Sequence, residues 1–191
     1  MIIVIEGIDG CGKTTQSFLL SADLGLSQLR FPDYNTMPQI RDFLEGKIQL
    51  NPKSLFLMYL ADICQGIYNS GFESKAVLLD RYIYSTVAYA RTMDRKTAMN
   101  IVKDVAPPVP DIVFWMDISA EKGLERKKNH KEPDRYEKDL EFMNEVKSVY
   151  EGMYKSRFYA KEWVRIDASK NVEEVHDEIM AKLKGLVPER Q

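Results

Sequence analysis

A single turn near the N-terminus constrains the fold of this chain more than any other feature. The apolar run MIIVI at residues 1–5 is followed directly by EGIDGCGKTTQ at residues 6–16. β-Branched residues favour a strand, glycines permit a tight turn, and the hydroxyl residues that follow suit the start of a helix. The stretch therefore predicts a strand, a turn that holds a ligand, and a helix that begins near Gly12.

Residues 7–14 match GxxxxGK(S/T), the pattern of a phosphate-binding P-loop. In such a loop, successive backbone N–H groups point at phosphate oxygens, and the positive end of the following helix adds to the attraction. Lys13 would reach the β- and γ-phosphates, and the Thr14 hydroxyl would bind Mg²⁺. The predicted nucleoside triphosphate site comprises Gly7, Asp9, Gly10, Cys11, Gly12, Lys13, Thr14 and Thr15.

Five strand-like runs alternate with stretches of helical spacing: residues 2–5, 27–31, 76–80, 112–117 and 163–166. This alternation predicts an α/β fold, with a five-stranded parallel sheet and helices on both of its faces. The third and fourth runs are nearly all apolar, as strands buried on both sides are. Asn51-Pro52 predicts the start of a helix to about residue 68, and Ser119 and Asn171 predict two further helix starts.

Composition limits the function classes. The chain has 191 residues, 45% of them hydrophobic, and no linker long enough to divide it, so we expect residues 1–191 to form one domain. A net charge of −2 argues against broad binding to nucleic acid, and no apolar run approaches the ~20 residues of a membrane span. Cys11 and Cys64 lack metal or disulfide spacing and are read as reduced thiols of a cytoplasmic protein. His130 and His176 are expected at the surface.

The segment LLDRYIYSTVAYA at residues 78–90 forms a second candidate site. Asp80, at the carboxyl end of a buried parallel strand, would face the same crevice as the P-loop and hold a metal-bound water. Arg81 beside it can pair with a phosphate, although an Asp–Arg pair at a strand end is also a common structural ion pair. The chain has no NKxD sequence for reading guanine and is short for a motor ATPase, so its size favours a kinase with a small acceptor.

The chain resembles the thymidylate kinases, P-loop enzymes that transfer the γ-phosphoryl group of ATP to dTMP. The motifs that match the family occur in its order across almost the whole length: EGIDGCGKTTQ, RFPDY, DRYIYSTVAY, PDIVFWMDISAEKGLERK and DRYE. The resemblance implies the P-loop nucleotide kinase fold with a short lid, and ATP with Mg²⁺ at Thr14 and Asp80. It also implies a homodimer, for which LFLMYL at residues 55–60 could serve as core or interface.

The resemblance further implies roles for single residues. Asp9 matches the carboxylate that contacts the 3′-hydroxyl of the acceptor sugar, and Tyr34 falls near the acceptor phosphate. Arg81 matches the arginine that holds this phosphate beside the γ-phosphate of ATP. The residues that match the acceptor nucleoside site are Phe31, Tyr59, Ser85, Thr86 and Tyr89. Among these, the aromatic ring at position 59 would stack on thymine, and that at position 89 would exclude a ribose 2′-hydroxyl.

Residues 126–137 match the family's lid and follow the fourth expected strand. Some thymidylate kinases carry a basic residue directly after the P-loop aspartate, whereas Gly10 stands there in this chain. Relatives with glycine at this position take a catalytic cation from the lid, and Arg135 is the first candidate here, followed by Arg126. Arg126 is also expected to bind the nucleoside triphosphate. The expected catalytic set is Asp9, Lys13, Arg81 and Arg135. Two lid lysines are expected at the surface, Lys127 and Lys128.

One position departs from the family. Ile63 stands four residues after Tyr59, where the family usually has an arginine that binds the base. Either another donor such as Gln65 replaces it, or the enzyme accepts other pyrimidine monophosphates such as dUMP and UMP. A P-loop nucleotide switch without turnover is a further alternative. Three carboxylates are as much structural as functional candidates: Asp33, Asp62 and Asp117.

Overall fold

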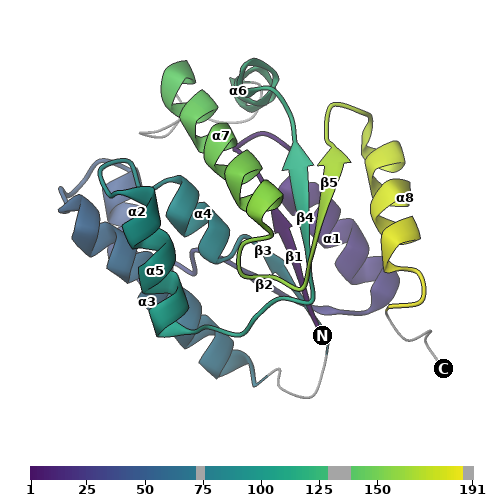
Figure 1. The fold of residues 1–191 in the computed structure, drawn as a ribbon, viewed down its shortest axis with the longest axis horizontal. Helices are drawn as coiled ribbons and strands as arrows, with labels where there is room; N and C mark the ends of the chain where they lie inside the picture. The colour runs from purple at the N-terminus through teal and green to yellow at the C-terminus, as the bar shows by residue number, and fades with distance from the viewer. Residues whose placement is uncertain (72–75, 129–138, 187–191) are drawn as a thin grey trace.

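A central parallel sheet organises the computed structural model, which describes residues 1–71, 76–128 and 139–186 (Figure 1). The strand order is β2-β3-β1-β4-β5. The strands are β1 (Ile2–Glu6), β2 (Ser27–Arg30), β3 (Val77–Asp80), β4 (Ile112–Asp117) and β5 (Glu162–Asp167). The prediction of a five-stranded parallel sheet is confirmed, and each expected run overlaps one of these strands.

Helices cover both faces of the sheet. The helices of the described residues are α1 (Lys13–Leu24), α2 (Pro38–Leu44), α3 (Pro52–Ser70), α4 (Ile83–Ala88), α5 (Arg95–Val105), α6 (Ala120–Lys128), α7 (Leu140–Ser156) and α8 (Val172–Leu183). Helices α1 and α8 contact each other on one face, while α7 packs on β4 and β5 from the other and contacts α4 (Figure 1). Among the described segments, no helix has the length and apolar character to cross a membrane.

The inner strands form the core because their side chains are apolar on both faces. Every residue of β1, β3 and β4 is buried, as the unbroken apolar sequence of β4 predicts. The edge strands are more open, because β2 consists of exposed and partly buried residues and β5 has only two buried residues among exposed and partly buried ones. Burial is therefore greatest along these three inner strands, of which β1 leads into the P-loop.

Local signals set the helix starts. The Asn51 side chain accepts a hydrogen bond from the Lys53 N–H, and proline follows at the first helical position of α3. Asn171 and Glu174 form a reciprocal capping box at the start of α8. Helix α1 begins directly after Gly12, as the glycine-rich turn predicts.

The parallel arrangement places the carboxyl ends of all five strands at one edge of the sheet, which lies toward the top of Figure 1. Ile5 of β1 is in register with Asp80 of β3, and Asp80 is in register with Arg30 of β2. The P-loop after β1 and the turn after β3 therefore emerge side by side. Open α/β sheets bind their ligands at this edge.

Candidate active site

The P-loop folds around the Lys13 side chain. Its ammonium group donates hydrogen bonds to the carbonyl oxygens of Gly7 at 3.0 Å and Ile8 at 2.8 Å, and it lies 3.6 Å from the Cys11 Sγ. Burial raises the pKa of the Cys11 thiol, which therefore stays protonated near neutral pH. Cys11 and Cys64 are free thiols. The P-loop carbonyl groups thus fix the ammonium group of Lys13, which lines the cavity.

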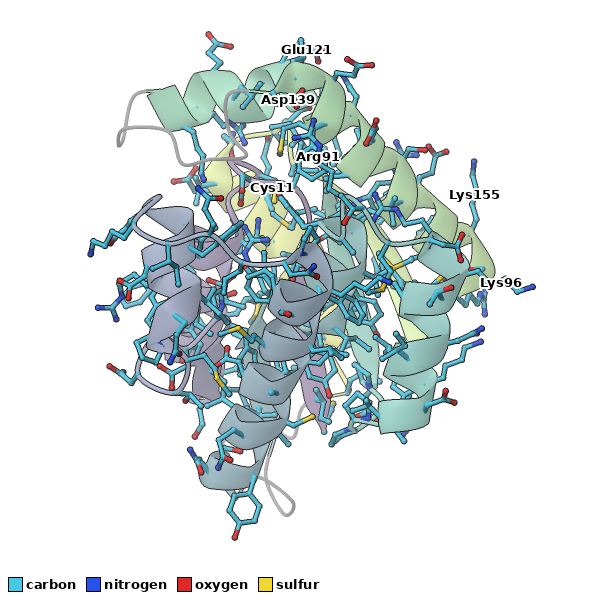
Figure 2. All side chains as sticks on the ribbon, turned by 90° about the vertical axis from the view of Figure 1, so that its left-hand side faces the viewer. Cys11, Arg91, Lys96, Glu121, Asp139 and Lys155 are labelled. Carbon is cyan, nitrogen blue, oxygen red and sulfur yellow. The ribbon has the colours of Figure 1, made fainter. Side chains whose placement is uncertain are left out.

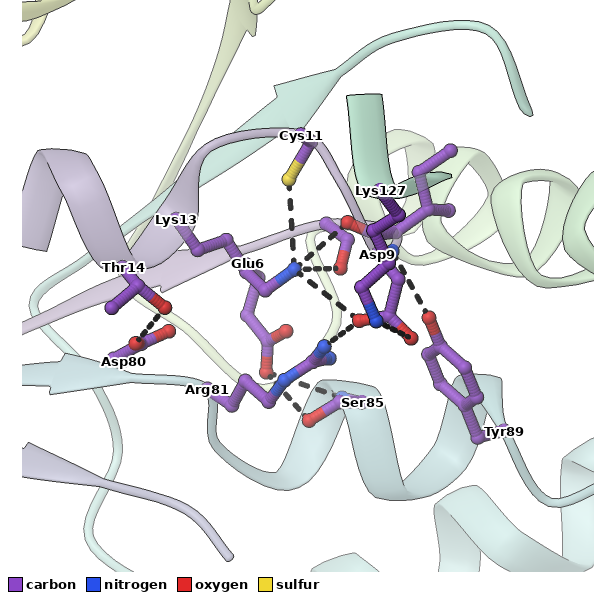
Figure 3. A network of polar contacts seen from close by, with 12 residues as sticks. Glu6, Asp9, Cys11, Lys13, Thr14, Asp80, Arg81, Ser85, Tyr89 and Lys127 are labelled. Carbon is purple, nitrogen blue, oxygen red and sulfur yellow. Dashed lines mark hydrogen bonds and ion pairs between the residues drawn. The ribbon is translucent and has the colours of Figure 1, made fainter. Parts of the chain in front are cut away.

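Two oxygen groups meet where α1 begins beside the end of β3. The Thr14 hydroxyl donates to Asp80 Oδ2 at 2.8 Å, and Asp80 is almost fully buried (Figure 3). Arg30 Nε lies 3.6 Å from the same oxygen. A hydroxyl and a carboxylate side by side form the hard oxygen donor set that Mg²⁺ prefers. The two residues expected at a metal site are therefore in contact.

Asp9 lies at the centre of a group of cations (Figure 3). The Arg81 guanidinium donates to its carboxylate, Lys127 Nζ lies 3.6 Å away, and Lys13 Nζ lies 4.0 Å away. Burial by itself would raise the pKa of Asp9, but these positive charges lower it well below the usual range. The Asp9 N–H also donates to the Tyr89 hydroxyl at 3.2 Å. Asp9 is therefore ionised at neutral pH, beside three cations suited to bind phosphate.

Helix α6 rests directly on the P-loop. Gly10 has φ of +79°, and a Cβ atom there would lie 2.0 Å from the Gly123 carbonyl oxygen. A Cβ atom on Gly123 would in turn lie 2.6 Å from the Asp9 carbonyl oxygen. This close contact between the backbones of α6 and the P-loop places Lys127 beside Asp9. The Lys127 side chain is 33% exposed. The expectation that Lys127 is a plain surface residue is wrong.

One cavity of about 1010 Å³ joins the P-loop to the residues expected around the acceptor. It is lined by all of the expected acceptor residues that the resemblance implies: Asp9, Phe31, Tyr34, Tyr59, Arg81, Ser85, Thr86 and Tyr89. The ring of Phe31 lies so close to Gly66 that a Cβ atom there would be 2.5 Å from it. Glycine at this point of α3 therefore lets the ring reach the cavity wall.

Ile63 also lines this cavity and is only 2% exposed. It forms an apolar wall with Leu55, Phe56 and Tyr59 of the same helix. Gln65 lies on the exposed side of α3, where its amide donates to Asn69 Oδ1 at 2.7 Å. The structure thus gives no support to Gln65 as a replacement for the missing arginine.

The other end of the cavity lies between α6 and the connection from β5 to α8. Arg126 Nη1 donates to the Ala168 carbonyl at 2.9 Å and Nη2 to the Lys170 carbonyl at 3.4 Å. Both of these residues line the cavity, together with Asn171. Arg126 therefore lines the end of the cavity formed by α6 and the connection from β5 to α8.

A second ion pair ties two elements together near this cavity. Arg91, which lines the cavity, donates to Asp139 at 2.7 Å, and both are labelled in Figure 2. The Asp139 side chain also accepts from the Phe142 N–H and so caps α7. Arg135 and His130 lie outside the described residues, so their predicted positions remain predictions. His176 is half-buried rather than fully exposed, with its Nε2 2.9 Å from Asp23.

The three undecided carboxylates all make contacts within the fold. Asp33 accepts hydrogen bonds from the Asn35 N–H and the Thr36 hydroxyl within its own turn. Asp117 pairs with Lys147 and Arg165 at the β4–β5 edge. A third carboxylate, Asp62, is buried beneath the loop that carries the acceptor aromatics.

The buried carboxyl group of Asp62 makes the free energy of unfolding depend on pH. Its Oδ2 accepts from the Asp33 N–H at 2.8 Å, while Oδ1 is buried without a hydrogen-bond partner among the described residues. Burial raises the pKa of Asp62 to about 6, from 3.8. A raised carboxyl pKa means that the folded state binds the proton more tightly, so this group lowers the free energy of unfolding as pH rises from about 4 to about 6.

Asp62→Asn is expected to remove this dependence. The amide keeps an acceptor for the Asp33 N–H, so the variant should exceed the wild type in unfolding free energy by about 1–3 kcal/mol at pH 7, with the difference disappearing near pH 4. Denaturant unfolding of both proteins at several pH values measures this. Parallel stability curves for the two proteins would contradict it.

The sequence pattern did not single out two residues of this region, Glu6 and Arg30. Glu6 was given no role, and the expected strand ended before it at residue 5, but it is the last residue of β1, fully buried, and accepts a hydrogen bond from the Tyr82 N–H in the turn after Arg81. Arg30 belongs to the RFPDY motif but was given no role. A charged residue at the end of a buried strand is the signal that could have singled out Glu6.

Comparison with known proteins decides the family. The family model described as thymidylate kinase matches residues 5–179. The chain belongs to the thymidylate kinase family. A thymidylate kinase of Leptospira interrogans serogroup Icterohaemorrhagiae serovar copenhageni is 31% identical over 192 residues, covering 94% of this chain and 92% of that protein.

Other members of the thymidylate kinase family match over a similar extent. A probable thymidylate kinase of Methanocaldococcus jannaschii is 33% identical, with 97% of each chain covered. A thymidylate kinase of Halothermothrix orenii is 32% identical, again over 97% of each chain. These relatives favour neither the nucleotide switch nor a kinase for another pyrimidine. Membership in this family makes the chain a nucleotide-using phosphotransferase.

A solved structure supports the fold independently. The structure of a deoxyadenosine kinase from M. mycoides, described with the products dCMP and a flexible dCDP bound, superposes with a TM-score of 0.75. The match covers 96% of this chain and 99% of that one, at 21% sequence identity. At this identity the likeness establishes the fold of a P-loop nucleoside kinase, as the sequence predicts.

Proposed function

We propose that this chain transfers the γ-phosphoryl group of ATP to dTMP, giving ADP and dTDP. The observation that carries the proposal is the convergence of Lys13, Arg81 and Lys127 on Asp9, at the junction of the P-loop and the acceptor end of the cavity. Two phosphate groups would meet at this junction. Their negative charges require a concentration of cations of this kind.

The transfer needs no covalent intermediate. An oxygen of the dTMP phosphate forms a bond to the γ-phosphorus while the bond from that phosphorus to the β,γ-bridging oxygen breaks, and ADP leaves with that oxygen. Lys13 binds the β- and γ-phosphates, and Arg81 holds the acceptor phosphate in line with them. Catalysis then comes from positioning and from neutralising charge in a partly enclosed site.

Thr14 and Asp80 are the residues that would hold Mg²⁺, and their adjacent oxygens fit a hard divalent cation. Mg²⁺ bound there would neutralise charge on the β- and γ-phosphate oxygens. Arg30 lies beside the same carboxylate and balances its charge. Thr14 lines the cavity, and Thr14 and Asp80 lie together apart from Asp9 (Figure 3).

The acceptor end of the cavity supports a deoxyribonucleotide with a planar base. Tyr59 and Phe31 offer faces for stacking, and the Tyr89 hydroxyl is held by the Asp9 backbone where it would crowd a 2′-hydroxyl. The apolar wall around Ile63 suits the methyl group of thymine. Thr86 of α4, which is buried, contributes a hydroxyl group to the lining of the same cavity.

We assign the remaining cations as follows. Lys127 contributes to phosphate binding from α6, because it already reaches Asp9. Arg126 serves the donor nucleoside, beside the connection from β5 to α8. Arg135 keeps its predicted role as a lid cation. The surface position predicted for Lys128 stays a prediction, because its side chain lies outside the described part of the structure.

The assembly and setting of the protein are part of the proposal. We propose a single domain over residues 1–191 that acts in the cytoplasm as a homodimer. Within residues 55–60, Leu55, Phe56 and Leu60 belong to the core, whereas Leu57 is 53% exposed. The exposed apolar positions of α3 are available to a second copy of the chain.

Product analysis tests the proposed reaction. The purified protein with ATP, dTMP and MgCl₂ should give equal amounts of ADP and dTDP by anion-exchange chromatography, and EDTA should stop the reaction. ATP consumption without dTDP would contradict the proposal. Such a result would leave a nucleotide hydrolase.

A further inference from the structure

Four hydrogen bonds reach the buried carboxyl group of Glu6. It is 0% exposed and lies at the end of β1, directly before the P-loop. Oε1 accepts hydrogen bonds from the Tyr82 N–H at 2.7 Å, the Ser85 N–H at 3.1 Å and the Ser85 hydroxyl at 3.3 Å. Oε2 accepts from the Tyr150 hydroxyl at 2.7 Å.

These bonds complete the start of α4. The first N–H groups of a helix have no partner within the helix, and a buried helix start needs acceptors from elsewhere. Tyr82 is the N-cap residue of α4, and its side chain makes no capping hydrogen bond. Glu6 therefore caps this helix from a different strand, through the N–H groups of Tyr82 and Ser85.

Arg81 lies between two fixed points. It has φ of +72°, a left-handed conformation that costs a non-glycine residue about 1–2 kcal/mol. Its N–H donates to the Ile5 carbonyl of β1 at 3.1 Å, and Glu6 holds the next residue along the chain. Both contacts come from the last two residues of β1. The backbone of Arg81 is thus set by the strand that also carries the P-loop.

The side chain of Arg81 follows from this backbone. It reaches Asp9, and its guanidinium lies 5.7 Å from the centre of the Tyr89 ring (Figure 3). Glu6 itself, being fully buried beneath the turn, has no surface to offer a substrate. Any effect of Glu6 on phosphoryl transfer must act through Arg81 or through the elements bonded to it.

We propose that Glu6 is a positioning residue that fixes Arg81 for the acceptor phosphate by capping α4, an inference that rests on the proposed function because it takes Arg81 as the acceptor-phosphate ligand. Through Tyr150 the same carboxylate anchors α7, the helix that begins after Asp139. Glu6 thus joins the P-loop strand, the acceptor-phosphate turn and α7 at one buried point.

Two substitutions of Glu6 test this proposal, one that shortens the side chain and one that replaces the carboxylate by an amide. Glu6→Asp keeps the charge but withdraws the carboxylate by one methylene, so kcat/KM for dTMP should fall about thirtyfold to a hundredfold, since small misplacements of catalytic groups cost about that much. KM for ATP should stay within about twofold of the wild type. Glu6→Gln keeps an acceptor for the two N–H groups and should stay within about tenfold of the wild-type kcat/KM.

Asp117→Asn is the matched control. Asp117 is also a buried carboxylate at the carboxyl end of a central strand, but it pairs with Lys147 and Arg165 away from Arg81. This variant should lose thermal stability and keep kcat/KM for dTMP within about twofold. It separates a loss of stability from a loss of acceptor positioning.

Three results would overturn the inference while the wild type turns over dTMP. Glu6→Asp could behave like the control, losing only thermal stability. Glu6→Gln could lose as much activity as an Arg81 variant, which would mean that charge and not capping geometry matters. If Glu6→Asp fails to fold, Tyr150→Phe tests the inference instead, because it removes one hydrogen bond to the Glu6 carboxylate. A drop in kcat/KM for dTMP of about threefold to tenfold would support the positioning role of Glu6, and a value equal to the wild type would overturn it. Failure of the wild type on dTMP would instead contradict the proposed function.

Discussion

Replacing Arg81 with methionine is expected to lower kcat/KM for dTMP about a thousandfold, the scale on which a transition-state cation acts in phosphoryl transfer. Methionine has a similar length and removes only the guanidinium, which contacts Asp9 and faces the Tyr89 ring. Burial by itself would lower the pKa of Arg81, but the Asp9 charge raises it well above its ordinary value, so the group is a fixed cation. Lysine at this position would not replace it, since it lacks the planar fork that binds two phosphate oxygens.

The measurement is a steady-state titration of dTMP at saturating ATP, with ADP affinity determined separately by calorimetry. ADP affinity should remain within about threefold of the wild type, because the proposed mechanism assigns the donor phosphates to Lys13 and not to Arg81. Arg165→Met is the control, an arginine that pairs with Asp117 at the edge of the sheet. A variant that retained more than a tenth of the wild-type kcat/KM for dTMP would contradict the role given to Arg81.

Substituting Gly10 with alanine is expected to lower the free energy of unfolding by about 2–4 kcal/mol and to reduce turnover with it. Two costs combine at this position. Gly10 has φ of +79°, and the new Cβ atom would lie 2.0 Å from the Gly123 carbonyl oxygen. Relief requires α6 to move away from the P-loop, which would withdraw Lys127 from Asp9. A basic residue at position 10 would meet the same obstacle and so could not supply a cation in this chain.

Gly152→Ala provides the matched control for this change. Gly152 lies within α7, where an added Cβ atom would meet nothing within 4 Å. Alanine favours a helix over glycine, so this variant should gain about 0.5–1 kcal/mol in unfolding free energy. Chemical denaturation and kcat determination on both variants test the contrast. A Gly10→Ala protein as stable as the wild type would show that α6 does not rest on the P-loop as described.

The parts of the fold that were predictable from sequence depend on local patterns. The unbroken apolar run in β4 required a strand buried on both faces, and Asn51-Pro52 fixed the start of α3. The glycine pattern of the P-loop specified its own function, because few other sequences place a lysine between a tight turn and a helix start. In each case the information lies within about ten neighbouring residues.

The contacts that were missed join distant segments. Tyr150 and Glu6 are 144 positions apart, and nothing in either local sequence indicates that they meet. Lys127 looked like one of several lid lysines, and only the close approach of Gly10 and Gly123 shows why it is carried to Asp9. The orientation of Gln65 away from the cavity could have been predicted from the sequence. Residues two apart on a helix face different sides, and Ile63 faces the cavity.

A comparison of acceptors tests the central claim most directly. With Mg-ATP at saturation, kcat/KM should be measured side by side for dTMP, dUMP, dCMP, UMP and dAMP. We expect the highest value for dTMP, with UMP lower than dUMP because of the proposed crowding of the 2′ position by Tyr89. Equal values for several acceptors would mean that the apolar wall at Ile63 does not select thymine. No turnover of dTMP would contradict the assignment of this chain as a kinase of thymidylate.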